Sequence, residues 1–146
     1  MKLKDALHQD HQKAEQLFEQ VQKATDAATI EKLFTELSGD LNAHATAEEE
    51  VVYPLARSFV YDDIGERYEE QDKMKETLKM LGSMDFSSSE FKTKLNNLKE
   101  EDQEHVKQEE SEMMDCFDRD MTDQEQAEIV EQFEAAKKEM KEKIAA

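Results

Sequence analysis

The chain has 146 residues, of which 38% are charged, and its formal net charge is −18. Because so acidic a surface repels phosphate groups and anionic lipid headgroups, we expect neither nucleic acid nor a membrane as a partner. Three glycines and one proline leave too few turn residues for a β sandwich. The predicted fold class is therefore all-α, and the length fits one domain with a sizeable core.

The compartment follows from what the sequence lacks. Residues 1–10 carry charges throughout, and no later stretch approaches the roughly 20 apolar residues of a membrane span. The single cysteine, Cys116, excludes an internal disulfide and fits a reducing environment. These features predict a cytoplasmic protein, which we expect to be a monomer or a weak homodimer.

Apolar periodicity predicts five helices, separated by short polar breaks. In chain order they cover residues 2–24, 28–58, 63–81, 88–118 and 123–143. Ser87 with Glu90, and Thr122 with Glu125, have the spacing of reciprocal caps at helix starts. Pro54 should bend the last turn of the second helix by removing one amide hydrogen bond.

The helix predicted at 28–58 carries an unbroken inward stripe with steps of four and three residues. Its members are Ile30, Phe34, Leu37, Leu41, His44, Glu48, Val51 and Leu55. The same spacing in the helix at 88–118 selects Phe91, Leu95, Leu98, Asp102, His105 and Glu109, followed by Met113 or Cys116. In each of these two helices a histidine and a glutamate, one turn apart, therefore point toward the core.

The first helix turns a third histidine inward, on the stripe Leu3, Leu7, His11, Ala14, Phe18 and Val21. Ionised carboxylates in an apolar bundle cost several kcal/mol unless they are paired, and a bound cation would supply the partner. Imidazole nitrogens with carboxylate oxygens suit iron, manganese or zinc. The alternative is a set of satisfied core polar residues, because a glutamate follows a histidine by four often by chance in so acidic a chain.

Several neighbouring residues have less specific roles. His8 lies off the stripe and is expected at the rim of the site or behind a ligand. Asp102 either orients His105 or lies at a solvated edge. Met113, Met114, Cys116 and Phe117 are interpreted as packing residues.

These residues resemble the hemerythrin HHE cation-binding family. The matching segments are DHQKAEQLF with His11, HATAEEEVVYPL with His44 and Glu48, and EEDQEHVKQEESEMMDCF with His105 and Glu109. The resemblance implies an up-down-up-down four-helix bundle over residues 1–118, with residues 119–146 as a helical extension packed on the same domain. It also implies two iron ions with an oxo or hydroxo bridge, His11 and His44 on one, His105 on the other, and Glu48 and Glu109 bridging.

The sequence departs from the family pattern in the third helix, where the family has a further histidine. Phasing against Met74, Leu78 and Leu81 places Gln71 at that position. The His105 position therefore lacks at least one nitrogen ligand and is expected to be weak or vacant. Weak ligation by Gln71, movement of Glu70 or Tyr68 into the site, a water molecule, or a single-metal centre remain open.

The resemblance implies a non-haem iron protein that binds dioxygen or a related small molecule, nitric oxide or peroxide, for sensing, storage or detoxification. Such a site needs a dry pocket, for which the apolar candidates are Leu41, Val52, Leu78, Phe91 and Leu98. The alternatives are an iron homeostasis or storage protein, a slow peroxidase or catalase-like enzyme at the same site, and an interaction module without metal. No separate acid or base stands out, so catalytic residues stay unassigned.

Overall fold

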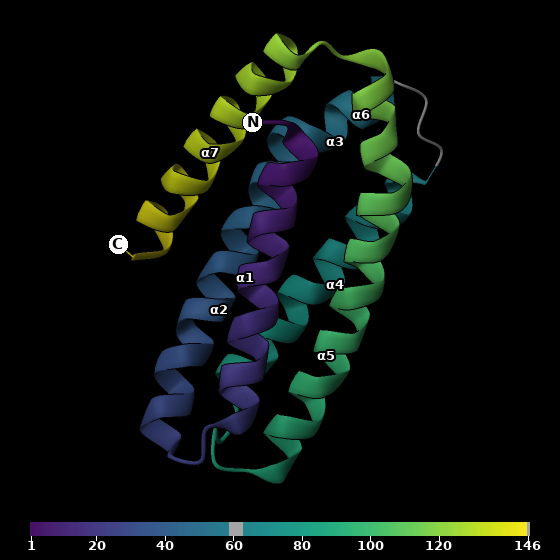
Figure 1. Ribbon diagram of the computed structural model, residues 1–146. Helices are drawn as coiled ribbons and strands as arrows, with labels where there is room; N and C mark the ends of the chain where they lie inside the picture. The colour runs from purple at the N-terminus through teal and green to yellow at the C-terminus, as the bar shows by residue number, and fades with distance from the viewer. Residues whose placement is uncertain (59–62, 146) are drawn as a thin grey trace.

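The computed structural model describes residues 1–58 and 63–145, so Ala146, the last residue of the expected extension, lies outside the described part. The described residues form helices and no strands, which confirms the predicted all-α bundle with an additional C-terminal helix (Figure 1). The elements are α1 (Leu3–Lys23), α2 (Ala27–Ala47), η1 (Glu48–Val52), α3 (Tyr53–Ser58), α4 (Ile64–Gly82), α5 (Ser89–Gln108), η2 (Glu109–Met113), α6 (Met114–Asp120) and α7 (Asp123–Ala145). Among the described residues, no helix is long and apolar enough to cross a membrane.

Polar side chains fix where two of the helices begin. The hydroxyl of Thr122 accepts a hydrogen bond from the Glu125 amide at 3.1 Å, and the Glu125 carboxylate accepts one from the Thr122 amide at 2.9 Å. This pair confirms the predicted reciprocal cap. At α5 the prediction was wrong by one residue, because Ser88 caps the helix by accepting from the Phe91 amide. The Ser87 hydroxyl instead donates to Asp85 in the preceding turn.

Two long helices contain a widened turn directly after an inward glutamate. In η1 the Tyr53 amide donates to the Glu48 carbonyl five residues earlier, and in η2 the Met114 amide donates to the Glu109 carbonyl. Each π turn inserts one residue into the helical repeat and shifts every later side chain by one position. The expected stripe through Val51 and Leu55 is therefore wrong beyond Glu48.

The shift changes which residues reach the core. Val52, Tyr53 and Ala56 are fully buried in the second long helix. In the fourth, Met113, Met114 and Phe117 are buried while Cys116 is partly exposed, so packing is the observed role of all but the cysteine. Pro54 is the second residue of α3, and its missing amide is tolerated there because the wide turn just before it has already left the regular ladder.

The core consists of two apolar clusters with a polar layer between them. One cluster surrounds Phe18, Phe34 and Phe91, and the other contains Leu3, Phe117 and Phe133. The polar layer comprises His11, His44, Glu48, His105 and Glu109, and it lies between the two clusters because its members follow the same stripes as the apolar residues. Both glutamates are fully buried.

The C-terminal helix α7 lies against α1 and α2 (Figure 1). Phe133 of α7 is fully buried and meets the His44 ring edge-on at a centroid distance of 5.4 Å. Near the start of α7, the Gln126 side-chain oxygen accepts a hydrogen bond from the Leu3 amide at 3.1 Å. The helix therefore contributes directly to the surroundings of a candidate ligand.

Candidate metal centre

His44 is held from both ends of its imidazole ring. Its Nδ1 lies 2.8 Å from Asp10 Oδ2, and Lys137 of α7 donates to both oxygens of the same carboxylate at 2.8 Å. Burial acts to raise the pKa of Asp10, but the hydrogen bonds and charges of His44 and Lys137 outweigh it and lower the pKa to about 2. The His44 Nε2 points to the centre of the bundle, 3.0 Å from Glu48 Oε1.

His11 of α1 has the same arrangement on the opposite side of the layer. Its Nδ1 lies 3.1 Å from Glu110 Oε2, and its Nε2 lies 3.4 Å from Glu109 Oε1. Burial opposes the charged ring, but the hydrogen bonds with Glu109 and Glu110 raise the pKa of His11 to about 9. The half-exposed His8 contacts the other oxygen of Glu110 at 2.5 Å, so His8 lies behind His11 at the surface.

His105 of α5 repeats the pattern a third time. Its Nδ1 lies 2.8 Å from Glu70 Oε1, and its Nε2 lies 3.1 Å from Glu109 Oε2. Burial lowers the pKa of His105, but the hydrogen bonds with Glu109 and Glu70 raise it to about 10. The carboxylate of Glu70 is itself held by the buried Arg67, whose Nε lies 3.0 Å away.

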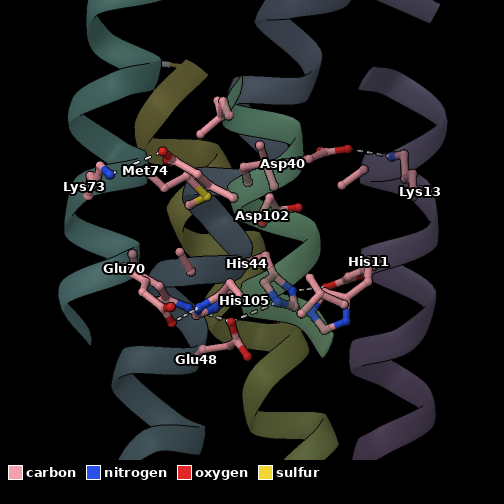
Figure 2. Close-up of a pocket in the computed structure, with 18 of the residues that line it drawn as sticks. His11, Lys13, Asp40, His44, Glu48, Glu70, Lys73, Met74, Asp102 and His105 are labelled. Carbon is pink, nitrogen blue, oxygen red and sulfur yellow. Dashed lines mark hydrogen bonds and ion pairs between the residues drawn. The ribbon is translucent and has the colours of Figure 1, made fainter. Parts of the chain in front are cut away.

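The three histidines therefore share one orientation. In each ring Nδ1 meets a carboxylate, while Nε2 faces the central pair Glu48 and Glu109. A carboxylate behind the imidazole fixes its tautomer and direction, which is how proteins support a histidine that binds a metal. Figure 2 shows His11, His44 and His105 gathered beside Glu48 at one end of the cavity.

The two central glutamates differ in their electrostatics although both are completely buried. Burial and the neighbouring Glu109 carboxylate raise the pKa of Glu48 well above its ordinary value. For Glu109, burial also acts to raise the pKa, but hydrogen bonds from Glu48, His105 and His11 hold it well below its ordinary value. One Glu109 oxygen faces His11 and the other faces His105, which is the placement expected of a bridging carboxylate.

Unpaired buried atoms collect around this pair. His44 Nε2, Glu48 Oε2, Glu109 Oε1 and Gln71 Oε1 are buried and lack a well-aligned hydrogen bond, although His44 Nε2 lies 3.0 Å from Glu48 Oε1 and Glu109 Oε1 lies 3.4 Å from His11 Nε2. A buried polar atom without a partner costs roughly 1–3 kcal/mol, so this concentration needs a physical reason. Ligand atoms of His11, His44, Glu48 and Glu109 all lie within 4.8 Å of one another, which fits one cation between them.

Gln71 occupies the place predicted for it, in the middle of α4. It is buried, and its Nε2 donates to Glu48 Oε1 at 2.7 Å and to the Tyr53 hydroxyl at 2.6 Å. Glu70, the other weak candidate, lies behind His105 on Nδ1, which favours an orienting role for it. The Tyr68 hydroxyl donates to the Glu49 carbonyl at 3.4 Å and contacts none of the three histidines, while the Tyr68 ring packs against Tyr53.

Sequence reasoning missed four side chains of this centre. Asp10 and Glu110 adjoin predicted site residues, but 37 acidic residues in the chain give these two no distinguishing signal. Lys137 lies on a helix that carried no expected role. Tyr53 was not singled out because a regular helix would turn it away from the stripe.

A cavity of about 390 Å³ opens beside the polar layer. Leu41 and Leu98 line it as expected, whereas Val52, Leu78 and Phe91 do not, so two of the five expected apolar residues face this cavity. Charged residues from five helices also line it, and these include Asp10, Lys13, Asp40, Lys73, Glu101, Asp102, Lys137 and Lys141. Asp102 faces this cavity while Glu70 takes the position behind His105, and burial raises the pKa of Asp102.

An all-α bundle with a buried layer of imidazoles and carboxylates is the architecture of a metal-binding helical protein. The chain belongs to the hemerythrin HHE cation-binding domain family, whose model matches residues 3–117. That match covers the bundle and the whole polar layer and ends before α7. The family and the cluster together support a metal-binding protein.

Two relatives resemble nearly the whole chain. A DNA nickase of Nostoc sp. strain PCC 7120 is 34% identical over 145 residues, which are 99% of this chain and 41% of the nickase. An uncharacterized hemerythrin-like protein of Schizosaccharomyces pombe is 27% identical over 142 residues, which are 94% of this chain and 70% of that protein. The chain thus spans less than half of the first relative. No solved structure matches this chain.

Proposed function

We propose that this chain is a non-haem di-iron protein that binds dioxygen or a related small molecule, nitric oxide or peroxide, for sensing, storage or detoxification. The observation that carries the proposal is the shared orientation of three imidazoles, each backed by a carboxylate and each facing Glu48 and Glu109. Mixed nitrogen and oxygen donors of this kind suit iron.

The proposed ligands divide into two halves that share Glu109. His11 and His44, with Glu48 and Glu109, would hold one ion, and their donor atoms already lie within 4.8 Å of one another. His105 and the second Glu109 oxygen belong to the other half, where the unpaired amide oxygen of Gln71 is a weak further donor. We expect the His105 half to bind its ion more weakly, because it has one imidazole where the first half has two.

Iron, when bound, supplies a reversible change between ferrous and ferric states and an affinity for small oxygen and nitrogen ligands. The protein residues would set its surroundings. Asp10, Glu110 and Glu70 hold the three rings in position, and the cavity gives a small molecule access from the side lined by Leu98 and Asp102. We place the protein in the cytoplasm, where the free Cys116 would stay reduced.

The first experiment combines elemental analysis with ultraviolet-visible spectra of protein purified with and without air. We expect close to two iron ions per chain and a reversible spectral change when the protein purified without air is exposed to dioxygen. His44→Ala should lose most of the metal, and His105→Ala should lose less, because His44 belongs to the half of the centre that has two imidazole ligands. His8→Ala is the control, since His8 is half-exposed and touches only Glu110 at this site. Equal metal content in wild type, His44→Ala and His105→Ala would refute the proposal.

Iron storage or homeostasis is the second candidate, favoured by the acidic side chains in the cavity wall, among them Asp40, Glu101 and Glu104. Iron binding that stabilises the fold without any spectral response to dioxygen would favour this reading. A peroxidase or catalase-like activity at the same centre is measured in the same samples by the consumption of peroxide.

The name of the Nostoc relative does not extend the proposal to nucleic acid. It describes a protein of which this chain spans 41%. A net charge of −18 repels phosphate groups, so we propose no nucleic-acid contact and no membrane contact for this domain. We propose a monomer or a weak homodimer.

A further inference from the structure

The second half of the centre contains an oxygen donor that the proposed ligand set does not use. Tyr53 is fully buried, and its hydroxyl oxygen lies 3.0 Å from Glu109 Oε2 and 3.3 Å from His105 Nε2. The third distance, between Glu109 Oε2 and His105 Nε2, is 3.1 Å. A tyrosine oxygen, a carboxylate oxygen and an imidazole nitrogen therefore form a nearly equilateral triangle.

The size of this triangle is informative. Two donors at right angles, each about 2.1 Å from a metal ion, are roughly 3 Å apart. All three edges have this length, so the three atoms match one face of an octahedral ion. A chain of ordinary hydrogen bonds needs short distances along its links, but it does not require the third edge to close at the same length.

The backbone brings Tyr53 to this position through the π turn η1. The Tyr53 amide donates to the Glu48 carbonyl, so the two residues lie one wide turn apart and face the same way. In a regular helix Val52 would lie over Glu48, and the tyrosine would point away from the centre. Widened turns of this kind are frequent at functional sites.

We propose that Tyr53 is a metal ligand, and that its phenolate completes the His105 half of the centre in place of the imidazole that α4 lacks. This inference rests on the proposed iron centre. Binding breaks the phenolic O–H bond and forms a bond between oxygen and metal, and the proton leaves to water. A site of one imidazole, one carboxylate and one phenolate prefers ferric over ferrous ion, because hard oxygen anions favour the higher charge.

The test is the spectrum of the iron-loaded full-length protein. Wild-type protein is loaded with ferrous iron without air and then oxidised with air, and we expect a broad visible charge-transfer band. Laser excitation within that band should enhance the ring vibrations of a metal-bound tyrosine. Tyr53→Phe should lose the band and about half of the iron, while the circular dichroism spectrum stays that of a folded helical protein.

Tyr68→Phe is the matched control, because the Tyr68 ring packs against Tyr53 at a centroid distance of 4.9 Å while its hydroxyl binds the Glu49 carbonyl. That variant, and Tyr61→Phe for the remaining tyrosine of the chain, should keep both the band and the iron. Two iron ions in the wild type without a tyrosine band would overturn the role of Tyr53 and leave the iron centre standing. Wild-type protein that binds no iron would overturn both.

Discussion

At the scale of single residues, the centre is organised by a partner at each of the two ring nitrogens of every imidazole. The outer partners are carboxylates from three different helices, and the inner partners are the two buried glutamates. Sequence periodicity was sufficient to place the three histidines and both glutamates in one layer, because each continues an apolar stripe. It was insufficient for Asp10 and Glu110, since nothing in an acidic chain marks which carboxylates face inward.

The protonation of His11 and His105 makes metal binding depend on pH. Their pKa values of about 9 and about 10 mean that both rings are protonated on both nitrogens, and so positively charged, at neutral pH. A metal ion must displace one of these protons from each ring. We therefore expect proton release on binding and an apparent affinity that rises from about pH 6 to about pH 9. Calorimetric titration of chelator-treated protein in two buffers of different ionisation enthalpy measures the released protons.

The same shifts have the opposite consequence for the stability of chelator-treated protein. A histidine whose pKa is raised by folding stabilises the fold fully below its ordinary pKa of 6.5, and this contribution is lost as the pH rises through about 9 and about 10. Unfolding by urea should then need less denaturant at high pH without metal.

For the metal-binding experiment, proton uptake on metal binding, or a metal affinity that falls with rising pH, would show that these two rings are not ligands.

At the scale of helices, the positions of the elements follow from the sequence, whereas the phase of two of them does not. Each predicted helix is present among the described residues, with ends displaced by only a few positions. The error begins at Glu48 and Glu109, where a wide turn inserts a residue. Periodicity analysis assumes a constant 3.6 residues per turn, so it cannot detect this change, and it consequently missed Tyr53.

Helix α7 is outside the family match, yet it reaches the centre through Phe133, which packs on the His44 ring, and through the ion pair of Lys137 with Asp10. Lys137 binds Asp10, and Asp10 binds His44 Nδ1. Lys137→Met removes the charge and keeps much of the apolar stem, and we expect metal affinity to fall about ten-fold or more because the support behind a ligand weakens. Competition with a fluorescent chelator measures this change. Lys138→Met, at an exposed neighbouring position of α7, should bind as wild type.

If Lys137→Met and Lys138→Met bind metal equally well, α7 serves only to cover the apolar core with Phe133 and its neighbours. The buried Phe133 and the cation of Lys137 lie 5.1 Å apart, so the two contributions must be separated by variants rather than by truncating the helix.

At the scale of the whole molecule, the strongest feature is its negative charge. A net charge of −18 on 146 residues repels itself in the folded state more than in the expanded chain. Added sodium chloride screens this repulsion, since the screening length falls from about 10 Å at 0.1 M to about 3 Å at 1 M. We expect the urea midpoint of the chain to rise with salt at constant pH and metal content. A midpoint that falls would mean that attractive ion pairs outweigh the net repulsion.

The domain matches only part of a longer relative. The chain corresponds to 41% of the Nostoc nickase, and the polar layer lies within the part that matches the family. A metal-binding bundle of this kind is compatible with an independent protein or with a module of a larger one. In either setting, the described residues of this chain supply the carboxylate at Nδ1 and the carboxylate at Nε2 of each of the three histidines.

The most direct test of the account is anomalous X-ray diffraction at the iron absorption edge, from crystals of protein loaded with ferrous iron. We predict two peaks flanking the carboxylate of Glu109, a strong one between His11 and His44 and a weaker one beside His105. Strong iron peaks confined to the outer acidic surface, with none inside the polar layer, would contradict the account.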